Sequence, residues 1–251
     1  MTSQTTPFDE ESADVRACRY RQINREMARI LSECKEVDKA IPLILQAMGE
    51  GLGWDYGTYW KPDQEAKNLH CAATWIDGSL DLAEFDADTW ERTFHVGEGV
   101  LGSAWKGGEP VWVTDIEQES GFQRPEIAKR AGLRSAIYIP IPTGQAERRD
   151  ALIEFLLGRP TEPDDVMVEM LHTVSSFVYQ YLRLRDAEVH LQNLRGLDLN
   201  DNVVQGLVMA RMAIESNNLD VAKESIDGAL EQAKRIINEL VVGASSFRRD
   251  G

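Results

Sequence analysis

The chain has 251 residues, of which 43% are hydrophobic, and its formal net charge at pH 7 is −15. This length allows one ordinary domain with an appendage or two small domains, and the hydrophobic content is sufficient for a packed core rather than a disordered chain. The negative charge excludes a sequence-independent grip on nucleic acid, which needs a basic surface.

The cysteines and the hydropathy pattern indicate in which cellular compartment the protein is expected. The three cysteines (Cys18, Cys34 and Cys71) are odd in number and widely spaced, which indicates reduced thiols rather than a disulfide framework. No apolar run approaches the roughly 20 residues that cross a bilayer. The polar and acidic N-terminus lacks the pattern of a signal peptide. We therefore expect a soluble, cytoplasmic protein without membrane contact.

Helices are predicted at the start of the chain. Residues 1–13 are rich in Ser, Thr and acidic residues and are predicted to be flexible. Apolar residues then recur at helical steps from Asp14 to Met48. Pro42 lies within this run and predicts a break near residues 39–40, with a second helix that starts close to the proline. Three glycines predict its end: Gly49, Gly51 and Gly53.

The pattern then changes from helix to strand. Residues 54–60 are rich in aromatic side chains and residues 69–75 are apolar, with polar residues between them, which predicts an antiparallel hairpin. Strands flanked by helices at both ends predict an α+β domain with an antiparallel sheet. The other predicted elements are a partly helical segment at 79–92, strands at 94–96, 111–113, 135–141 and 150–157, and a helix at 123–131 capped by Gly132.

Glycine and aromatic motifs follow one another in this region. They are Gly53-Trp54-Asp55, Leu69-His70-Cys71 with Trp75, the glycine-rich run Gly97–Gly102, Trp105, the run Gly108–Asp115, the run Ala131–Ala136, Ile139-Pro140-Ile141 and Glu154-Phe155. Together they make residues 35–183 resemble a GAF domain, the small-molecule sensory module found upstream of bacterial signalling outputs. The resemblance implies a central sheet and a ligand pocket on one of its faces. The segment 14–34 would then be a separate N-terminal helix.

The aromatic side chains have two interpretations that stay open: they fill the core, or some of them line a pocket for a small molecule. Trp60 and Trp75 are predicted on adjacent strands, and the resemblance places Trp105 and Trp112 in the segment that covers the pocket. Arg134 or His95 would be the polar contact. The candidate pocket residues are Tyr59, Trp60, Cys71, Trp75, His95, Trp105, Trp112 and Arg134.

No metal site is expected, and the sequence does not name a cofactor. The four histidines lack metal-ligand spacing and there is no Cys-x-x-Cys motif. Because haem-binding GAF domains exist, His70 or His95 as an axial ligand remains an alternative. The cyclic-nucleotide signature of the family is absent. The run Gly97–Gly102 lacks the ending of a P-loop and is interpreted as a turn.

The last third of the chain predicts two long helices. Helical periodicity runs on from Pro163, a turn is predicted at Asn217-Asn218, and a second helix is predicted to stop at Gly243, before a tail at 244–251. The near-heptad spacing of Phe177, Leu184 and Leu191 predicts a parallel seam between two subunits. Two helices alone cannot bury both apolar faces, so residues 184–243 are expected to form a four-helix bundle in a homodimer.

A short motif near the middle of this region resembles the phosphoacceptor box of sensor histidine kinases of the nitrate- and oxygen-sensor type, E-L-H-D-x-x-x-Q. The corresponding residues are Asp198, Asn200, Asp201 and Gln205. Asn200 takes the place of the histidine, and an amide cannot form the phosphoramidate. The sequence has no nucleotide-binding glycine motif, and the 46 residues that follow Gln205 leave no room for an ATP-binding domain. The hairpin is therefore interpreted as that of a pseudo-histidine kinase.

These observations predict a non-catalytic, dimeric sensory adaptor. Its GAF domain would detect a small ligand or a partner and relay the change through the helical bundle to a response regulator, a kinase or a transcription factor, without direct contact with nucleic acid. The alternatives are a phosphatase or phosphotransfer component that uses Asp201 and Gln205, and a truncated histidine kinase that carries a His-to-Asn change. A GAF domain that only dimerises, without a ligand, also stays open.

Overall fold

The computed structural model describes residues 13–63, 67–142, 149–162 and 165–246. The chain divides into two compact units, Met1–Arg185 and Asp186–Gly251, which are described separately. The predicted flexible N-terminus lies outside the described residues apart from Ala13, and so do residues 247–251 of the predicted tail. None of the described helices combines the length and apolar character needed to cross a membrane.

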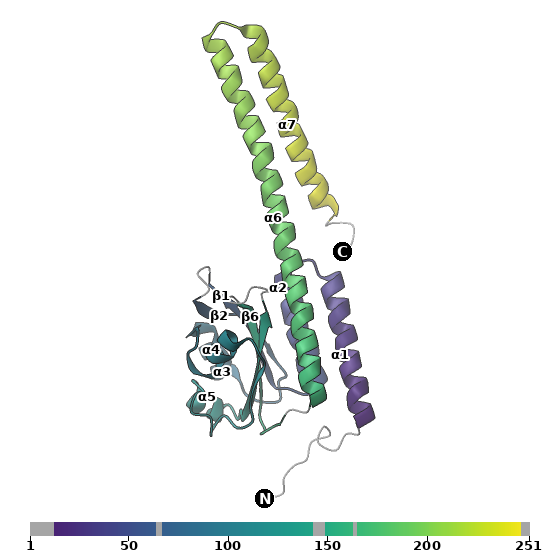
Figure 1. The fold of residues 1–251 in the computed structure, drawn as a ribbon, viewed down its shortest axis with the longest axis vertical. Helices are drawn as coiled ribbons and strands as arrows, with labels where there is room; N and C mark the ends of the chain where they lie inside the picture. Colours follow the sequence, from purple (N-terminus) through teal and green to yellow (C-terminus); the bar gives the residue numbers. More distant parts are fainter. Residues whose placement is uncertain (1–12, 64–66, 143–148, 163–164, 247–251) are drawn as a thin grey trace, which may run out of the picture. The chain divides into compact units, whose positions relative to one another are not determined.

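The first unit is built around a sheet (Figure 1). The sheet has six strands in the order β3-β2-β1-β6-β5-β4. Every neighbouring pair is antiparallel, which confirms the predicted α+β class. The predicted strands are all present, with ends shifted by one or two residues. They are β1 (Tyr56–Pro62), β2 (Asn68–Ile76), β3 (Thr93–His95), β4 (Val111–Val113), β5 (Ser135–Pro142) and β6 (Arg149–Leu157).

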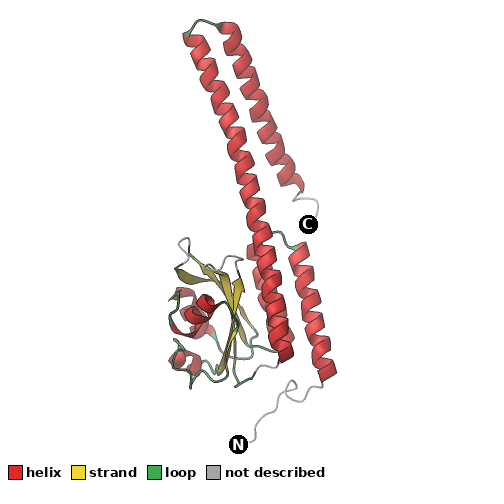
Figure 2. Cartoon of the chain, viewed as in Figure 1, coloured by secondary structure: helices red, strands yellow, loops and turns green. Residues whose placement is uncertain are grey.

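Helices cover both faces of the sheet (Figure 2). One face carries three short helices: α3 (Ala83–Glu91), α4 (Gly99–Gly107) and α5 (Pro125–Arg130). The other packs against α1 (Ala13–Glu33), α2 (Val37–Leu52) and the first turns of α6 (Asp165–Glu215). Two separate hydrophobic cores result, one on each face.

The first helix break is not where the sequence predicted it. The chain leaves helical geometry after Glu33 and α2 begins at Val37, so that Pro42 lies inside α2. A proline there removes one backbone hydrogen bond. The apolar face of α2 continues past the proline through Ile41, Ile44 and Leu45, all buried, and this packing outweighs the lost bond.

A β-bulge changes the direction of side chains in β2. The register pairs Tyr59 with Ala73 but Trp60 with Cys71, so that Ala72 has no partner on β1. Because successive strand residues point to opposite faces, this extra residue reverses the parity. Cys71 therefore packs on the α3–α5 face, whereas Trp75 packs on the face of α1, α2 and α6.

The second unit is a helical hairpin of the end of α6 and α7 (Leu219–Ser246). The predicted turn is confirmed: Asn217 has a φ of 57°, and Asn218 Oδ1 accepts a 3.3 Å hydrogen bond from the Val221 N–H at the start of α7. The helix α7 runs through Gly243, where a stop was predicted, to Ser246. A glycine only lowers helix propensity, by about 1 kcal/mol.

Candidate functional site

The first unit contains a buried carboxylate at the middle of its sheet, and this group is the starting point for a candidate site. Glu154 lies on β6 between Thr58 of β1 and Tyr138 of β5, and its side chain is fully buried. Strand alternation turns it toward the face that α3, α4 and α5 cover, with Tyr56, Trp60 and Tyr138. A buried carboxylate needs a partner, because desolvation of an unpaired charge is very costly.

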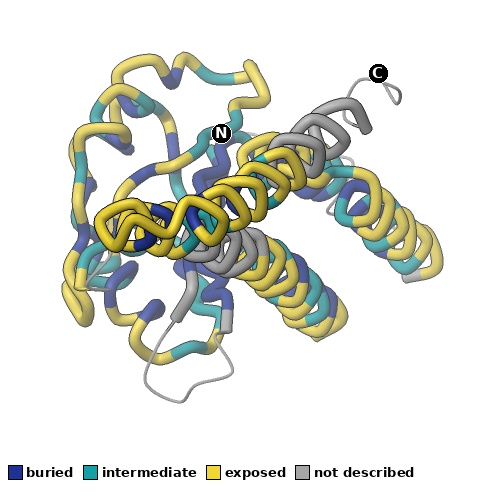
Figure 3. The backbone as a smooth tube through the Cα atoms, turned by 90° about the horizontal axis from the view of Figure 1, so that it is seen from above, coloured by how far each residue is buried: buried dark blue, intermediate teal, exposed yellow. Residues whose placement is uncertain are grey.

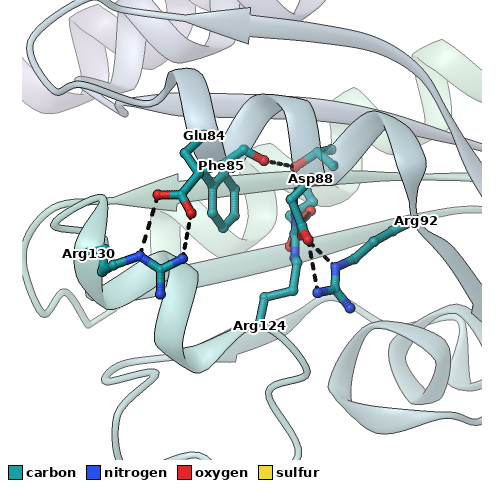
Figure 4. Close-up of polar contacts among 8 residues, drawn as sticks. Glu84, Phe85, Asp88, Arg92, Arg124 and Arg130 are labelled. Carbon is teal, nitrogen blue, oxygen red and sulfur yellow. Dashed lines mark hydrogen bonds and ion pairs between the residues drawn. The ribbon is translucent and has the colours of Figure 1, made fainter.

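Arg124 is that partner. It is only 3% exposed and precedes α5 as its N-cap residue. Its Nη2 lies 2.8 Å from Glu154 Oε1 and 2.7 Å from Oε2, and its Nη1 donates a 2.7 Å hydrogen bond to Thr89 Oγ1 on α3. Figure 4 shows Arg124 reaching toward α3 between two surface ion pairs, Glu84–Arg130 and Asp88–Arg92.

Aromatic rings surround the ion pair. The guanidinium carbon of Arg124 lies 4.4 Å from the centre of the Phe85 ring and 5.7 Å from those of Trp60 and Phe94. Trp60 Nε1 also donates a 2.9 Å hydrogen bond to Glu154 Oε2. Cation–π contacts of this kind are worth about 2 kcal/mol when they are desolvated. The cluster therefore satisfies both charges without solvent.

Burial and the ion pair set the protonation states of the cluster. Burial acts to lower the pKa of Arg124, but the Glu154 carboxylate outweighs it, so the guanidinium pKa lies above its ordinary value. Burial, together with the nearby Glu154 charge, raises the pKa of Tyr138 well above its ordinary range. Burial likewise raises the pKa of Tyr56, whose hydroxyl donates a 2.9 Å hydrogen bond to Asp86 Oδ1. Both phenols are therefore neutral at physiological pH.

The cluster nearly fills the space under the short helices. A residual cavity of about 10 Å³ remains beside Arg124 and Glu154, bounded among others by Phe94, Phe122 and Gln123. A space of this size holds at most one water molecule. A wider groove of about 510 Å³ lies between α1 and α2, but it is an open surface groove walled by Gln and Glu side chains beside apolar ones.

The predicted pocket residues are divided between the two faces of the sheet. Trp60, Cys71 and Trp105 are buried on the α3–α5 face. Tyr59, Trp75 and Trp112 belong to the core under α1, α2 and α6. Trp60 and Trp75 therefore do not share a pocket, although their strands are neighbours, because the bulge at Ala72 lies between them.

The predicted polar contacts of the pocket also lie elsewhere. His95 is exposed on β3, and its Nδ1 contacts Asn68 Oδ1. Arg134 forms ion pairs with Asp115 at 3.2 Å and with Glu117 at 3.7 Å. The cavity lining includes neither of them. Arg124 and Glu154 line the cavity instead, and neither is among the pocket residues predicted from the sequence. The sequence does contain a pattern that points to a buried charge at Glu154, because Glu154 is the one acidic residue in the apolar run Ala151–Leu157.

The residues predicted to resemble a phosphoacceptor box lie on α6. The side chains of Asp198, Asn200 and Asp201 fall outside the described residues, whereas Gln205 is exposed. Within the part of the chain that the structure describes, no three His, Cys, Asp or Glu side chains gather in a way that could hold a metal ion.

Comparison with known proteins agrees with this architecture. The family model of the GAF domain matches residues 34–182, so the chain belongs to the GAF domain family. This family is typically a sensory or ligand-binding domain in signalling proteins. None of the curated proteins matches the sequence.

Several solved structures share the fold. The GAF domain of A. aeolicus nlh2 in an inactive state has a TM-score of 0.55 at 14% identity, over 68% of this chain and 99% of that one. The GAF domain of a phosphoenolpyruvate-protein phosphotransferase from Coxiella burnetii has a TM-score of 0.58 at 16% identity, over 69% and 98%. Free methionine-R-sulfoxide reductase from Neisseria meningitidis, in complex with its substrate, has a TM-score of 0.56 at 16% identity, over 71% and 96%. At such identities the likeness concerns the fold.

Proposed function

We propose that the chain is a non-catalytic, cytoplasmic sensory adaptor whose GAF domain detects a small ligand or a protein partner. The helix α6 would relay the resulting change to the hairpin. One observation carries this proposal: α6 is a single helix of 51 residues that begins in the core of the GAF domain and ends as one arm of the hairpin.

The start of α6 is firmly attached to the sheet. Leu171, Val174 and Val178 are completely buried in the core below it. Ser175 Oγ also donates a 2.7 Å hydrogen bond to the Pro140 carbonyl on β5, the strand next to β6. Because close-packed interiors transmit small displacements, a shift of β5 and β6 would move the whole helix.

The hairpin offers a surface for a second copy of the chain. Small residues fill the space between its helices: a Cβ built on Gly206 of α6 would lie 3.0 Å from Ala229 Cβ of α7. Large apolar residues are exposed instead, with Leu207 at 52% and Ile226 at 43% exposure. Figure 3 shows long stretches of the helical tube in the colour of exposed residues. Such a surface would be buried by a homodimer in which two hairpins form a four-helix bundle. Leu184 and Leu191, both exposed, would continue the contact as a helical seam.

The bundle would then dock a signalling partner, such as a response regulator, a kinase or a transcription factor. Asn200 in the phosphoacceptor position supports docking rather than phosphotransfer. A second candidate function is a phosphatase that acts through Asp201 and Gln205, and the exposure of Gln205 favours it. A truncated histidine kinase with a His-to-Asn change would share the same hairpin.

Light scattering on the full chain tests the dimer. The chain of 28.2 kDa is expected at twice that mass at micromolar concentration. Leu207→Glu and Ile226→Glu should each shift it toward the monomer while near-ultraviolet circular dichroism of the GAF domain stays unchanged. Glu224→Arg, at an exposed polar position of α7, is the matched control and should remain dimeric. A wild-type monomer would contradict the proposal.

A second experiment tests the absence of catalysis. The chain is incubated with labelled ATP and, separately, with a phosphorylated response regulator. We expect neither label on the chain nor faster loss of phosphate from the regulator. Loss of phosphate that disappears in Asp201→Ala or Gln205→Ala would instead establish the phosphatase.

A further inference from the structure

We propose that the cluster around Glu154 is a receptor for a planar organic cation, a guanidinium or amidinium group, and that Arg124 occupies this receptor from within the chain. The inference rests on the sensory role proposed above and names the class of ligand that the GAF domain would detect. It follows from three features of the cluster. The acceptors match a planar cation, Arg124 comes from a different segment than the acceptors, and Gln123 Oε1 at the cavity has no hydrogen-bond partner among the described residues.

The complementarity concerns charge, shape and hydrogen bonding together. Glu154 presents both carboxylate oxygens to the guanidinium at 2.7 and 2.8 Å, and Thr89 Oγ1 accepts a third hydrogen bond at 2.7 Å. The Phe85 ring lies 4.4 Å from the guanidinium carbon. One nitrogen, Nη2, reaches both carboxylate oxygens, while a second, Nη1, reaches Thr89 on another element. A flat cation that carries two N–H-bearing nitrogens and lies against the Phe85 ring can make these contacts at once, whereas a compact ammonium group has only one nitrogen.

The receptor is held in place without Arg124. Glu154 sits on β6 between two strands, and Trp60 Nε1 fixes its Oε2 through a 2.9 Å hydrogen bond. Thr89 is anchored on α3 by a 2.8 Å hydrogen bond from its hydroxyl to the Phe85 carbonyl. The acceptors therefore keep their positions whichever cation lies between them.

Arg124 comes from a different part of the domain. It ends the connection 114–124 between β4 and α5, which is neither helix nor strand. Among the backbone hydrogen bonds that join this connection to its surroundings are Ile116 N–H to Arg134 O at 2.8 Å and Val100 N–H to Gly121 O at 3.0 Å. The Arg124 carbonyl also accepts a 3.0 Å hydrogen bond from the Ala128 N–H of α5. Exchange would therefore require only the Arg124 side chain to leave the cluster, while its backbone and the sheet stay in place. Since an unpaired buried carboxylate is strongly unfavourable, only a ligand that brings its own cation can replace Arg124.

The cavity offers one more acceptor. Gln123 Oε1 is buried, lines the cavity next to Arg124, and has no hydrogen-bond partner among the described residues. An N–H donor of a bound amidinium or guanidinium would satisfy it. An anionic ligand is excluded in place of the Arg124 side chain, because it would be repelled by the buried Glu154 carboxylate. The Thr89 hydroxyl could not donate to it either, since it already donates to the Phe85 carbonyl. Departure of the Arg124 side chain would provide the volume that the present cavity of about 10 Å³ lacks.

Calorimetric titration of the full chain tests the inference, with phenylguanidine and benzamidine as probes and benzylamine and benzoate as comparison compounds. We expect saturable binding of the two planar cations by the wild type and none of benzoate. Arg124→Ala removes the internal competitor and should tighten binding by about tenfold or more. Thr89→Val, which keeps the shape and the charge pair, should weaken it. Glu84→Gln, in a surface ion pair on α3, is the matched control and should bind as the wild type does.

Two results would overturn the inference. Planar cations that bind Arg124→Ala but not the wild type would show that Arg124 is a fixed structural clamp. Binding of benzoate, or equal binding of benzylamine, would show a site of another class. Glu154→Gln should abolish binding, and the gain in Arg124→Ala keeps the test decisive if Glu154→Gln does not fold. A dimer that forms normally but binds no cation refutes this inference alone, whereas a monomer refutes the function proposed above.

Discussion

Trp60 Nε1 donates a 2.9 Å hydrogen bond to Oε2 of Glu154 on the neighbouring strand. The two residues are diagonal neighbours, because the register pairs Glu154 with Thr58 and Trp60 with Leu152. Diagonal positions on one face of a sheet are within reach of an aromatic side chain. This hydrogen bond fixes the orientation of the carboxylate that forms the ion pair with Arg124. Single substitutions in this cluster therefore test how much each contact contributes to the stability of the GAF domain.

The hydrogen bond itself can be removed without emptying the core. Trp60→Phe keeps an aromatic ring but leaves Glu154 with one donor fewer. Because hydrogen bonds to charged groups are worth about 1.5–3 kcal/mol, we expect the free energy of unfolding to fall by at least that amount, plus a cavity contribution. Urea denaturation measures it. Trp90→Phe is the control, since Trp90 is 50% exposed, and should change stability little. Equal effects at both sites would contradict the assignment.

The ion pair should be strongly non-additive. Glu154→Gln leaves a buried guanidinium without its counter-charge, and losses of roughly 3–5 kcal/mol are typical of such changes. The double change Glu154→Gln with Arg124→Gln removes both charges and should recover part of that loss. A double-mutant cycle by chemical denaturation gives the coupling energy. A double variant that loses the full sum of the two single effects would show that the charges do not stabilise each other.

The packing of the hairpin predicts opposite effects at two glycines. Gly228 lies inside α7, and a built Cβ meets no atom within 4 Å, so Gly228→Ala should stabilise the hairpin by about 1 kcal/mol through helix propensity. Gly206 faces Ala229, and Gly206→Val should destabilise it by about 1–3 kcal/mol through overpacking. Thermal melts followed by far-ultraviolet circular dichroism compare the two. Stabilisation by Gly206→Val would refute the close approach of the helices.

Alkaline pH should destabilise the GAF domain. Burial raises the pKa of the Cys71 thiol from 9.0 to about 12. The unfolded chain therefore releases this proton at lower pH than the folded chain, so that stability is complete below pH 9 and falls as the pH rises from 9 to about 12. Tyr56 and Tyr138, whose pKa values are also raised by burial, act in the same direction.

Denaturation at a series of pH values measures this slope, and Cys71→Ala should make it shallower. In the native protein a thiol reagent should modify the exposed Cys18 quickly and leave Cys71 intact until unfolding. Rapid reaction of Cys71 at neutral pH would contradict its buried position.

Local pattern was sufficient for most of the elements. The hairpin of β1 and β2, the strands β5 and β6 and the turn at Asn217 depend on neighbouring residues, and the sequence predicted each of them within a few positions. Pro42 shows the limit of local rules, because the proline disfavours a helix that the buried face of α2 nevertheless maintains.

The sequence by itself determined the α+β class, the order of the elements and the GAF motifs, since these depend on residue type and short spacing. Only the tertiary structure decided which side chains meet. One unpaired residue, Ala72, moves Trp75 to the opposite face from Trp60. Arg124 and Glu154 are 30 residues apart in the chain, and a loop and a central strand bring them together in the fold. They form an ion pair there because both side chains are buried, so that each charge needs the other in place of solvent.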